Sequence, residues 1–151
     1  MGLAVFCVIE KSMKHFIFTV VALLLSVMAF AEKAERSAMA KSRGERLTVK
    51  EWKTTPDGKN KWIDHTEVYN EKGQLVEEAE YGDFGRHLVW RAEFTYNAQG
   101  QLIMEVVYNE RNKVSKVRKY EYDSSGVCTR RLNYNANGTL NSYRQFEYSF
   151  E

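Results

Sequence analysis

Three tryptophans are the side chains of this 151-residue sequence best suited to stacking on a ligand. Trp52 and Trp62 flank Thr55-Pro56-Asp57-Gly58, whose proline and glycine indicate a tight turn. A hairpin through that turn sets the two indole rings opposite each other, on the face of the expected sheet that carries few other aromatic residues. With Trp90, they form the candidate surface for a carbohydrate ring.

A second candidate site, for a small anionic ligand, consists of arginines. The strand register derived below puts Arg130 directly opposite Arg144, with Arg118 nearby, on an otherwise apolar face. Glu67 and Glu77 come opposite each other on the same face. Like charges so placed repel unless something neutralises them. Two explanations stay open: either the sheet brings the glutamates to the arginines or leaves them at a wet rim, or the arginines await an anion.

No constellation in the sequence is typical of an enzyme. Glu67 and Glu77 would lie side by side rather than on either side of a bond, so glycoside hydrolysis is the least favoured interpretation. His65, His87 and Cys128 lack the spacing of metal ligands. We therefore expect no catalytic residue, no metal site and no cofactor.

The elements that must position these residues are strands joined by tight turns. From residue 52 onward, Tyr, Val, Thr and Phe alternate with charged residues between recurring Asn/Asp-x-x-Gly segments. This spacing predicts type I turns closed by a left-handed residue, with Asn112 in place of glycine in one of them. The turns predict five cross-strand pairs: Tyr69 with Leu75, Tyr96 with Leu102, Tyr108 with Val114, Tyr122 with Cys128, and Tyr134 with Leu140.

Tyrosines mark the repeat of these strands. They occur at 69, 81, 96, 108, 122, 134 and 148, so two strands recur about every 26 residues. The sequence predicts an all-β fold, an eight-stranded antiparallel meander of hairpins forming a single curved sheet over residues 47–151; the alternative is a closed up-and-down barrel. A longer loop at 82–86 would pair Tyr81 with Leu88 and keep the alternation in phase. The aromatic residues would then share one face, which must roll up, dimerise or be covered.

The Tyr-Asn/Asp-x-x-Gly-x-Leu units over residues 66–148 resemble the tyrosine-aspartate repeats of Rhs-type bacterial proteins. The chain is also similar to small uncharacterised secreted proteins of Bacteroidetes with such hairpin repeats. The first resemblance implies a continuous antiparallel sheet, although this chain is too short to enclose a cargo as Rhs-like shells do. The second implies no particular activity.

The beginning of the chain is typical of a signal peptide. Residues 16–27 are apolar, follow Lys11 and Lys14, and run into Ala29-Phe30-Ala31, a small-x-small cleavage site. The apolar stretch is shorter than the roughly 20 residues of a bilayer span. We expect residues 1–31 to be removed and the protein to be secreted or periplasmic, with no membrane insertion after cleavage. Met13 is the more natural start.

Two expectations concern the chain that follows the cleavage site. Residues 32–46 are charged and nearly without large apolar side chains, so they should form a flexible leader. Removal of residues 1–31 leaves 20 cationic and 19 acidic residues out of 22 and 20. This balance does not indicate a nucleic-acid partner.

The function expected from the sequence is that of a non-catalytic exported module for binding or structure, acting through its sheet face or its edges. Its partner would be an unidentified protein or glycan, or a second copy of the chain joined through the apolar face. The alternative is a protein that binds a carbohydrate or a small anionic ligand through the residues named above.

The cleavage site gives the first prediction. The exported protein should begin at Glu32, because Ala29 and Ala31 supply the small residues that signal peptidase requires. Intact-mass spectrometry of the protein recovered from the periplasm or medium measures this directly. Recovery of the protein with residues 1–31 attached would contradict processing at this site.

Overall fold

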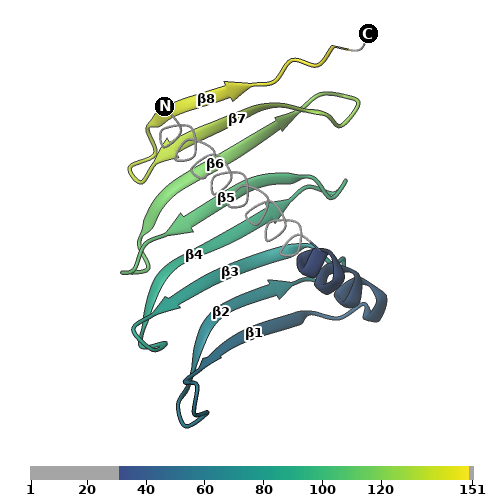
Figure 1. The fold of residues 1–151 in the computed structure, drawn as a ribbon. Coiled ribbons are helices and arrows are strands. Elements are labelled where there is room, and N and C mark those ends of the chain that lie inside the picture. Colours follow the sequence, from purple (N-terminus) through teal and green to yellow (C-terminus); the bar gives the residue numbers. More distant parts are fainter. Residues whose placement is uncertain (1–30, 150–151) are drawn as a thin grey trace, which may run out of the picture.

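The fold consists of one open antiparallel sheet and one helix (Figure 1), seen in a computed structural model that describes residues 31–149. Eight strands lie side by side in chain order: β1 (Leu47–Thr54), β2 (Lys61–Tyr69), β3 (Leu75–Gly82), β4 (His87–Tyr96), β5 (Leu102–Tyr108), β6 (Val114–Tyr122), β7 (Cys128–Asn135) and β8 (Leu140–Gln145). The predicted meander is confirmed. Because β1 and β8 form opposite edges, the closed barrel is wrong.

Two observations bear on the beginning of the chain. The predicted signal peptide lies outside the described residues except for Ala31. Within residues 31–149, no helix is long and apolar enough to cross a membrane.

The hairpin turns have the expected conformation. Gly73, Gly100, Gly126 and Gly138 have φ between 76° and 87°, and Asn112 has φ of 55°. In the first of these turns, the amide of Gly73 donates to the carbonyl of Asn70 at 2.9 Å, and the amide of Asn70 donates to the carbonyl of Gln74 at 3.0 Å. All five predicted tyrosine pairs are present, as is the pair of Tyr81 with Leu88.

Every strand pairing also contains a register shift that the sequence pattern did not predict. In β2–β3, Tyr69 lies opposite Leu75, but Val68 lies opposite Glu77, so Val76 is an extra residue on the returning strand. One extra residue reverses which face the following side chains occupy. The alternation therefore does not stay in phase across the sheet.

Three predicted pairs are wrong, the first two because of these extra residues and the third because six residues, 55–60, separate β1 from β2. Glu67 lies opposite Glu78 rather than Glu77. Arg130 lies opposite Gln145, and Arg131 takes its place opposite Arg144. Trp62 lies opposite Lys53, while Trp52 lies opposite Ile63.

The bulges divide the apolar residues between both faces of the sheet. Opposite residues share a face, so one face, the helix-side face, carries Glu67, Glu78, Ala92, Phe94, Glu105, Arg118, Tyr120, Arg131 and Arg144. The back face carries Val68, Ala79, Arg91, Glu93, Met104, Val106, Val117, Leu132 and Tyr134. The sheet therefore has no single apolar face. The prediction of a homodimer rested on such a face and is not supported by this arrangement.

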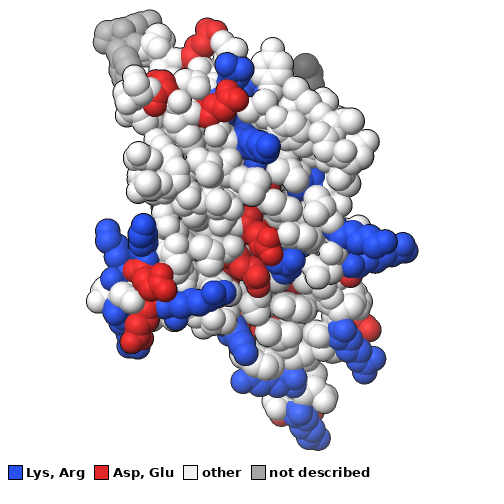
Figure 2. All heavy atoms as spheres, turned by 180° about the vertical axis from the view of Figure 1, so that it is seen from behind, with Lys and Arg blue, Asp and Glu red and all other residues white. Residues whose placement is uncertain are grey.

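Charges are mixed on the molecular surface as well. Seen from behind (Figure 2), acidic and basic side chains lie next to one another along the middle of the molecule, and basic side chains predominate toward its lower end.

Residues 31–43 form a helix, where a flexible leader was expected over 32–46. The side chains turned toward the sheet are Lys33, Arg36, Ser37 and Ala40, which recur at helical spacing and are more buried than their neighbours. Ala40 is 1% exposed. Because this stripe is small or charged, the sequence shows no hydrophobic period that would announce a helix.

Gly44 ends this helix with φ of 64°. The amide of Glu45 donates to the carbonyl of Ala40, and the amide of Gly44 donates to the carbonyl of Lys41. These two bonds are those of a Schellman motif, in which a left-handed glycine satisfies the last carbonyls of a helix. The chain then turns directly into β1.

The contact between this helix and the first repeat turn gives the second prediction. Asn tolerates positive φ, so Gly138→Asn should change the free energy of unfolding by less than about 0.5 kcal/mol, since a Cβ at Gly138 meets no atom within 4 Å. Gly73→Asn should destabilise clearly, because its Cβ would collide with the main-chain oxygen of Ser37. Urea denaturation of both variants measures the difference. Equal stabilities would mean that the helix does not pack on this turn.

Candidate functional site

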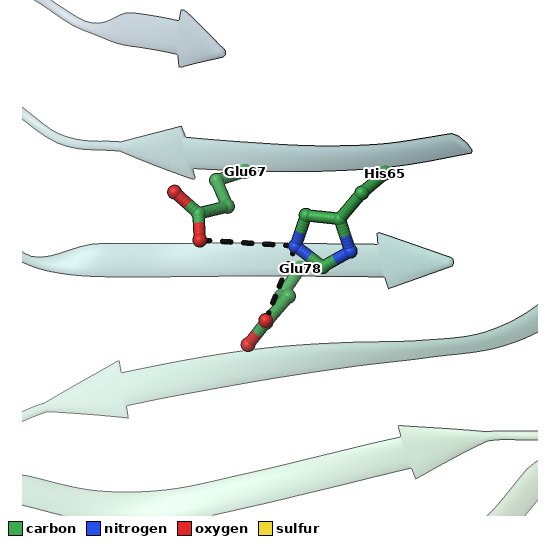
Figure 3. Close-up of side chains that lie close together, drawn as sticks. All are labelled: His65, Glu67 and Glu78. Atoms are coloured by element: carbon green, nitrogen blue, oxygen red, sulfur yellow. Dashed lines mark ion pairs between the residues drawn. The ribbon is translucent and has the colours of Figure 1, made fainter. Parts of the chain in front are cut away.

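A cluster of ionisable side chains lies under the helix, where β2 and β3 meet. His65, Glu67 and Glu78 point toward one another from these two strands (Figure 3). The Nε2 atom of His65 lies 3.2 Å from Oε1 of Glu78 and 3.7 Å from Oε1 of Glu67. Glu67 is 1% exposed, so its charge is almost completely removed from water.

The helix supplies the cations that this cluster requires. Arg36 Nη1 donates to Glu67 Oε2 at 2.8 Å and to Glu51 Oε1 at 2.9 Å. Lys33 Nζ lies 2.8 Å from Glu78 Oε1 and 3.6 Å from Glu67 Oε1. The hydroxyl of Tyr69 donates to Glu67 Oε2 at 2.8 Å. Lys33 and Arg36 of the helix therefore neutralise the opposed carboxylates. The sequence predicted that opposed glutamates need such counter-charges.

The pKa values follow from these contacts. Burial by itself raises the pKa of Glu67, but hydrogen bonds from Arg36 and Tyr69 outweigh it and hold the pKa below its usual 4.5. Burial opposes ionisation of Glu78 too, and the partners His65 and Lys33 lower its pKa overall. The hydrogen bond to Glu78 raises the pKa of His65 above 6.5, against the effect of burial.

An imidazole and two carboxylates are a donor set that a divalent cation accepts. Here the ammonium of Lys33 already lies between the two carboxylates. A metal ion would have to displace that ammonium and the proton shared with His65. The cluster is therefore a set of ion pairs that fixes the helix to the sheet. We call these pairs, formed by Lys33, Arg36 and His65 with Glu67 and Glu78, the ionic latch.

The predicted tryptophan surface is not assembled. Lys61 Nζ lies 4.7 Å from the ring centroid of Trp52, which is half exposed. Trp62 packs edge to face on Phe84 with the centroids 4.9 Å apart. Trp90 donates from Nε1 to Glu80 at 2.5 Å. Among the described residues, no ring contact joins two tryptophans.

The predicted arginine cluster is formed by a different set of residues. Arg130 pairs with Glu121 at 3.2 Å, and the register places it on the back face. Arg118 lies on the helix-side face and forms an ion pair with Glu105. Arg144 lies on the same face opposite Arg131, a residue that was not among the predicted site residues.

Aromatic residues recur on the helix-side face, where the sequence predicted an aromatic face that must be covered. The strands β2, β4 and β6 each end in a tyrosine. In each strand, this tyrosine and the residue two positions before it lie on the helix-side face. In β2 these are Glu67 and Tyr69, which the helix covers. The next two sets are Phe94 with Tyr96 in β4 and Tyr120 with Tyr122 in β6. Phe146 and Tyr148 follow the end of β8 at the equivalent spacing, and Tyr148 makes the equivalent hydroxyl contact. These three sets are here called the aromatic pairs.

The tyrosine of each aromatic pair is pinned to the neighbouring strand. The hydroxyl of Tyr96 donates to the carbonyl of Leu75 at 2.8 Å, that of Tyr122 to Leu102 at 2.8 Å, and that of Tyr148 to Cys128 at 3.0 Å. A ring whose hydroxyl reaches the next strand must lie down over the sheet. Burial raises the pKa of Tyr96 and Tyr122 above the usual 10, so both hydroxyls are protonated donors at neutral pH.

Two equivalent surface grooves lie over these rings. The β3–β4 groove is lined by Val76, Phe94 and Tyr96, with Asn70, Gln74 and Asn97 at its turn end. The β5–β6 groove is lined by Ile103, Tyr120 and Tyr122, with Asn97, Gln101 and Asp123 at its turn end. The aromatic-x-Tyr-Asn/Asp segments before the turns were visible in the sequence, but their exposure depends on the bulges.

Amide side chains join the turns at this end of the sheet. Gln74 Nε2 donates to the carbonyl of Gly100 at 3.4 Å, and Gln101 Nε2 donates to that of Gly126 at 3.0 Å. Ser37 of the helix donates to the carbonyl of Gly73 at 2.5 Å and so occupies the equivalent position one repeat earlier. The helix thus covers the sheet beside the first of these turns. The equivalent positions beside the next two turns of this kind are the open β3–β4 and β5–β6 grooves.

Comparison of the sequence with protein-family models and with curated proteins finds no match.

The ionic latch gives the third prediction. Because the pKa of His65 is raised in the folded state, its stabilisation is present below about pH 6.5 and is lost as the pH rises through the folded-state value. His65→Gln should therefore cost more stability at about pH 5.5 than at about pH 8.5. Urea denaturation at both pH values measures this change.

The control for this experiment is His87→Gln, which alters an exposed histidine in β4. Its effect should be small at both pH values. If the cost of His65→Gln is the same at both pH values, protonated His65 does not hold the carboxylates together.

Proposed function

We propose that this protein is a non-catalytic, exported carbohydrate-binding module that acts through the helix-side face of its sheet. The observation that carries the proposal is the recurrence of aromatic pairs on that face, each pinned by a tyrosine hydroxyl. The site differs from the tryptophan surface expected from the sequence. The ligand class, carbohydrate, is one that the sequence analysis gave as an alternative function.

Aromatic rings held flat are suited to sugar rings. The C–H bonds on one face of a pyranose carry partial positive charge, and they pack favourably on the negative face of an aromatic ring. Tyr96 and Tyr122 cannot rotate freely because their hydroxyls are bonded to the main chain, so little conformational entropy is lost on binding. Gln99 and Asp123 line the β5–β6 groove and offer polar groups to sugar hydroxyls.

The carboxylates of the helix-side face support binding rather than hydrolysis. Glu67 and Glu78 are held by cations under the helix, and Glu105 is held by Arg118 and Tyr120. Each accepts from a fixed partner. A general acid needs a raised pKa, whereas the pKa values of Glu67 and Glu78 are lowered.

One observation favours a second function, that of a structural module. All six residues of β8 are exposed, and the outer edge of this strand has no neighbour in the described part of the chain. An open edge can add a strand from another molecule. Tyr143 and Leu140, which are 61% and 51% exposed, would then be covered. Light scattering distinguishes this function, since strand addition between copies raises the solution mass.

The fourth prediction tests the carbohydrate function with two matched tyrosines. Tyr148 and Tyr143 are 58% and 61% exposed, but Tyr143 lies opposite Leu132 on the back face. Tyr148→Ala should weaken binding of a polysaccharide selected on a glycan array by about tenfold, the loss of one stacked ring. Tyr143→Ala should leave binding unchanged. Affinity electrophoresis measures both.

Two outcomes would contradict the proposal. If no plant, algal or bacterial polysaccharide binds to the full chain, the module does not recognise carbohydrate. If both alanine variants bind as the unaltered protein does, or both lose affinity equally, the aromatic pairs are not the site. Thermal denaturation of each variant separates lost binding from lost folding.

A further inference from the structure

The last repeat on the helix-side face carries two arginines opposite each other. We propose that Arg131 and Arg144 bind an anionic group of the carbohydrate, so that the ligand is a linear acidic polysaccharide. This inference rests on the proposed function, because it names the ligand class of the same face. The anionic group is a carboxylate or a sulfate ester, which guanidinium groups bind by the same bidentate hydrogen bonds.

The arginine pair differs from the residues at the equivalent positions of the preceding repeats. The side chain that precedes the tyrosine has two neighbours across the next two strands. They are Glu78 and Ala92 beside Glu67, Glu105 and Arg118 beside Phe94, and Arg131 and Arg144 beside Tyr120. The first set is neutralised by the helix, and the second forms its own ion pair. The third brings two positive charges together.

These two positive charges have no counter-ion in the part of the chain that the structure describes. Neither Arg131 nor Arg144 forms an ion pair there, and Nε of Arg131 is shut off from solvent without a hydrogen-bond partner. The nearby Arg130 is on the back face, where it already holds Glu121. Two opposed guanidinium groups repel each other, and a bound anion removes that repulsion.

The anion site lies next to the stacking surface. Tyr120 is directly opposite Arg131, and Arg131 is directly opposite Arg144. Phe146 and Tyr148 follow Arg144 in the chain, directly after the end of β8. A sugar stacked on Tyr120 therefore lies beside a strand that carries an arginine, at one strand spacing of about 5 Å.

The spacing of the aromatic pairs indicates a linear ligand. Each pair recurs after two strands, a distance of about 9 to 10 Å across the sheet. This distance is close to the length of a disaccharide in an extended 1,4-linked polysaccharide. Alternate sugars of one chain would reach successive aromatic pairs, and the several contacts would add avidity that a short oligosaccharide lacks.

The fifth prediction compares three polysaccharides by affinity electrophoresis and calorimetry on the full chain. They are polygalacturonate, its neutral methyl ester, and dextran sulfate, at about 0.15 M salt to suppress long-range attraction. Polygalacturonate or dextran sulfate should bind at least about tenfold more tightly than the ester. Preference for one of the two acidic polymers identifies the anionic group as carboxylate or sulfate.

Variants locate the binding. Arg131→Gln and Arg144→Gln should each weaken binding of the preferred acidic polymer by about tenfold and leave binding of the ester unchanged. The matched control is Arg111→Gln, an exposed arginine in the turn after β5. Because Arg131 is half buried, thermal denaturation must show that its variant is folded, and the exposed Arg144 provides the test if it is not.

The failures of the two proposals are distinguishable. Equal affinity for acid and ester, with Tyr148→Ala still weakening both, overturns the arginine site and leaves carbohydrate binding standing. An equal loss in all three arginine variants also overturns the site, because binding then depends on net charge alone. If none of the three polymers binds and the array is also negative, both proposals fail.

Discussion

The placement of side chains over most of this sheet depends on one backbone constraint, the left-handed residue that closes each of five hairpins. Gly73, Gly100, Gly126 and Gly138 adopt positive φ at no steric cost, and Asn112 adopts it at a small one. The turn that this residue closes brings its tyrosine opposite the second residue after it. One further residue then bulges out of the returning strand. The bulge decides which side chains face the helix and which face the back.

Opposed charges are the second consequence of that register. Burying Glu67 beside Glu78 costs more free energy than their separate burial, because two carboxylates without counter-ions repel strongly at low dielectric. The helix over residues 31–43 offsets this cost with Lys33 and Arg36 and buries little apolar surface in doing so. The charge pattern of the first two strands and the presence of the helix are therefore parts of one arrangement. Toward the other end of the sheet, Arg131 and Arg144 form a pair of like charges of the opposite sign, two positive charges facing each other.

A single-layer sheet has little interior, and this protein stabilises itself accordingly. Among the described residues, the buried hydrophobic side chains are Ala40, Val68, Tyr69, Ala79 and Ala92. Main-chain hydrogen bonds between strands, cross-strand pairs and the ladder of amide side chains along the turns hold the remainder together. Rings that would fill the core of a two-layer protein are left half exposed on the helix-side face. That exposure makes the face available for a ligand.

The sequence by itself determined the strands, their order and the pairs nearest the turns, because glycine at positive φ and tyrosine before Asn or Asp are local signals. It did not determine the pairs farther from the turns, since the bulged residue carries no distinctive side chain: Val76, Ile103 and Thr129 all occupy it. An error of one position moved Glu77 and Arg130 into the places of Glu78 and Arg131. The helix escaped prediction because it docks through charges and small residues rather than an apolar stripe. Tertiary structure alone decided which charges meet, because ion pairs between a helix and a sheet depend on contacts that no sequence period records.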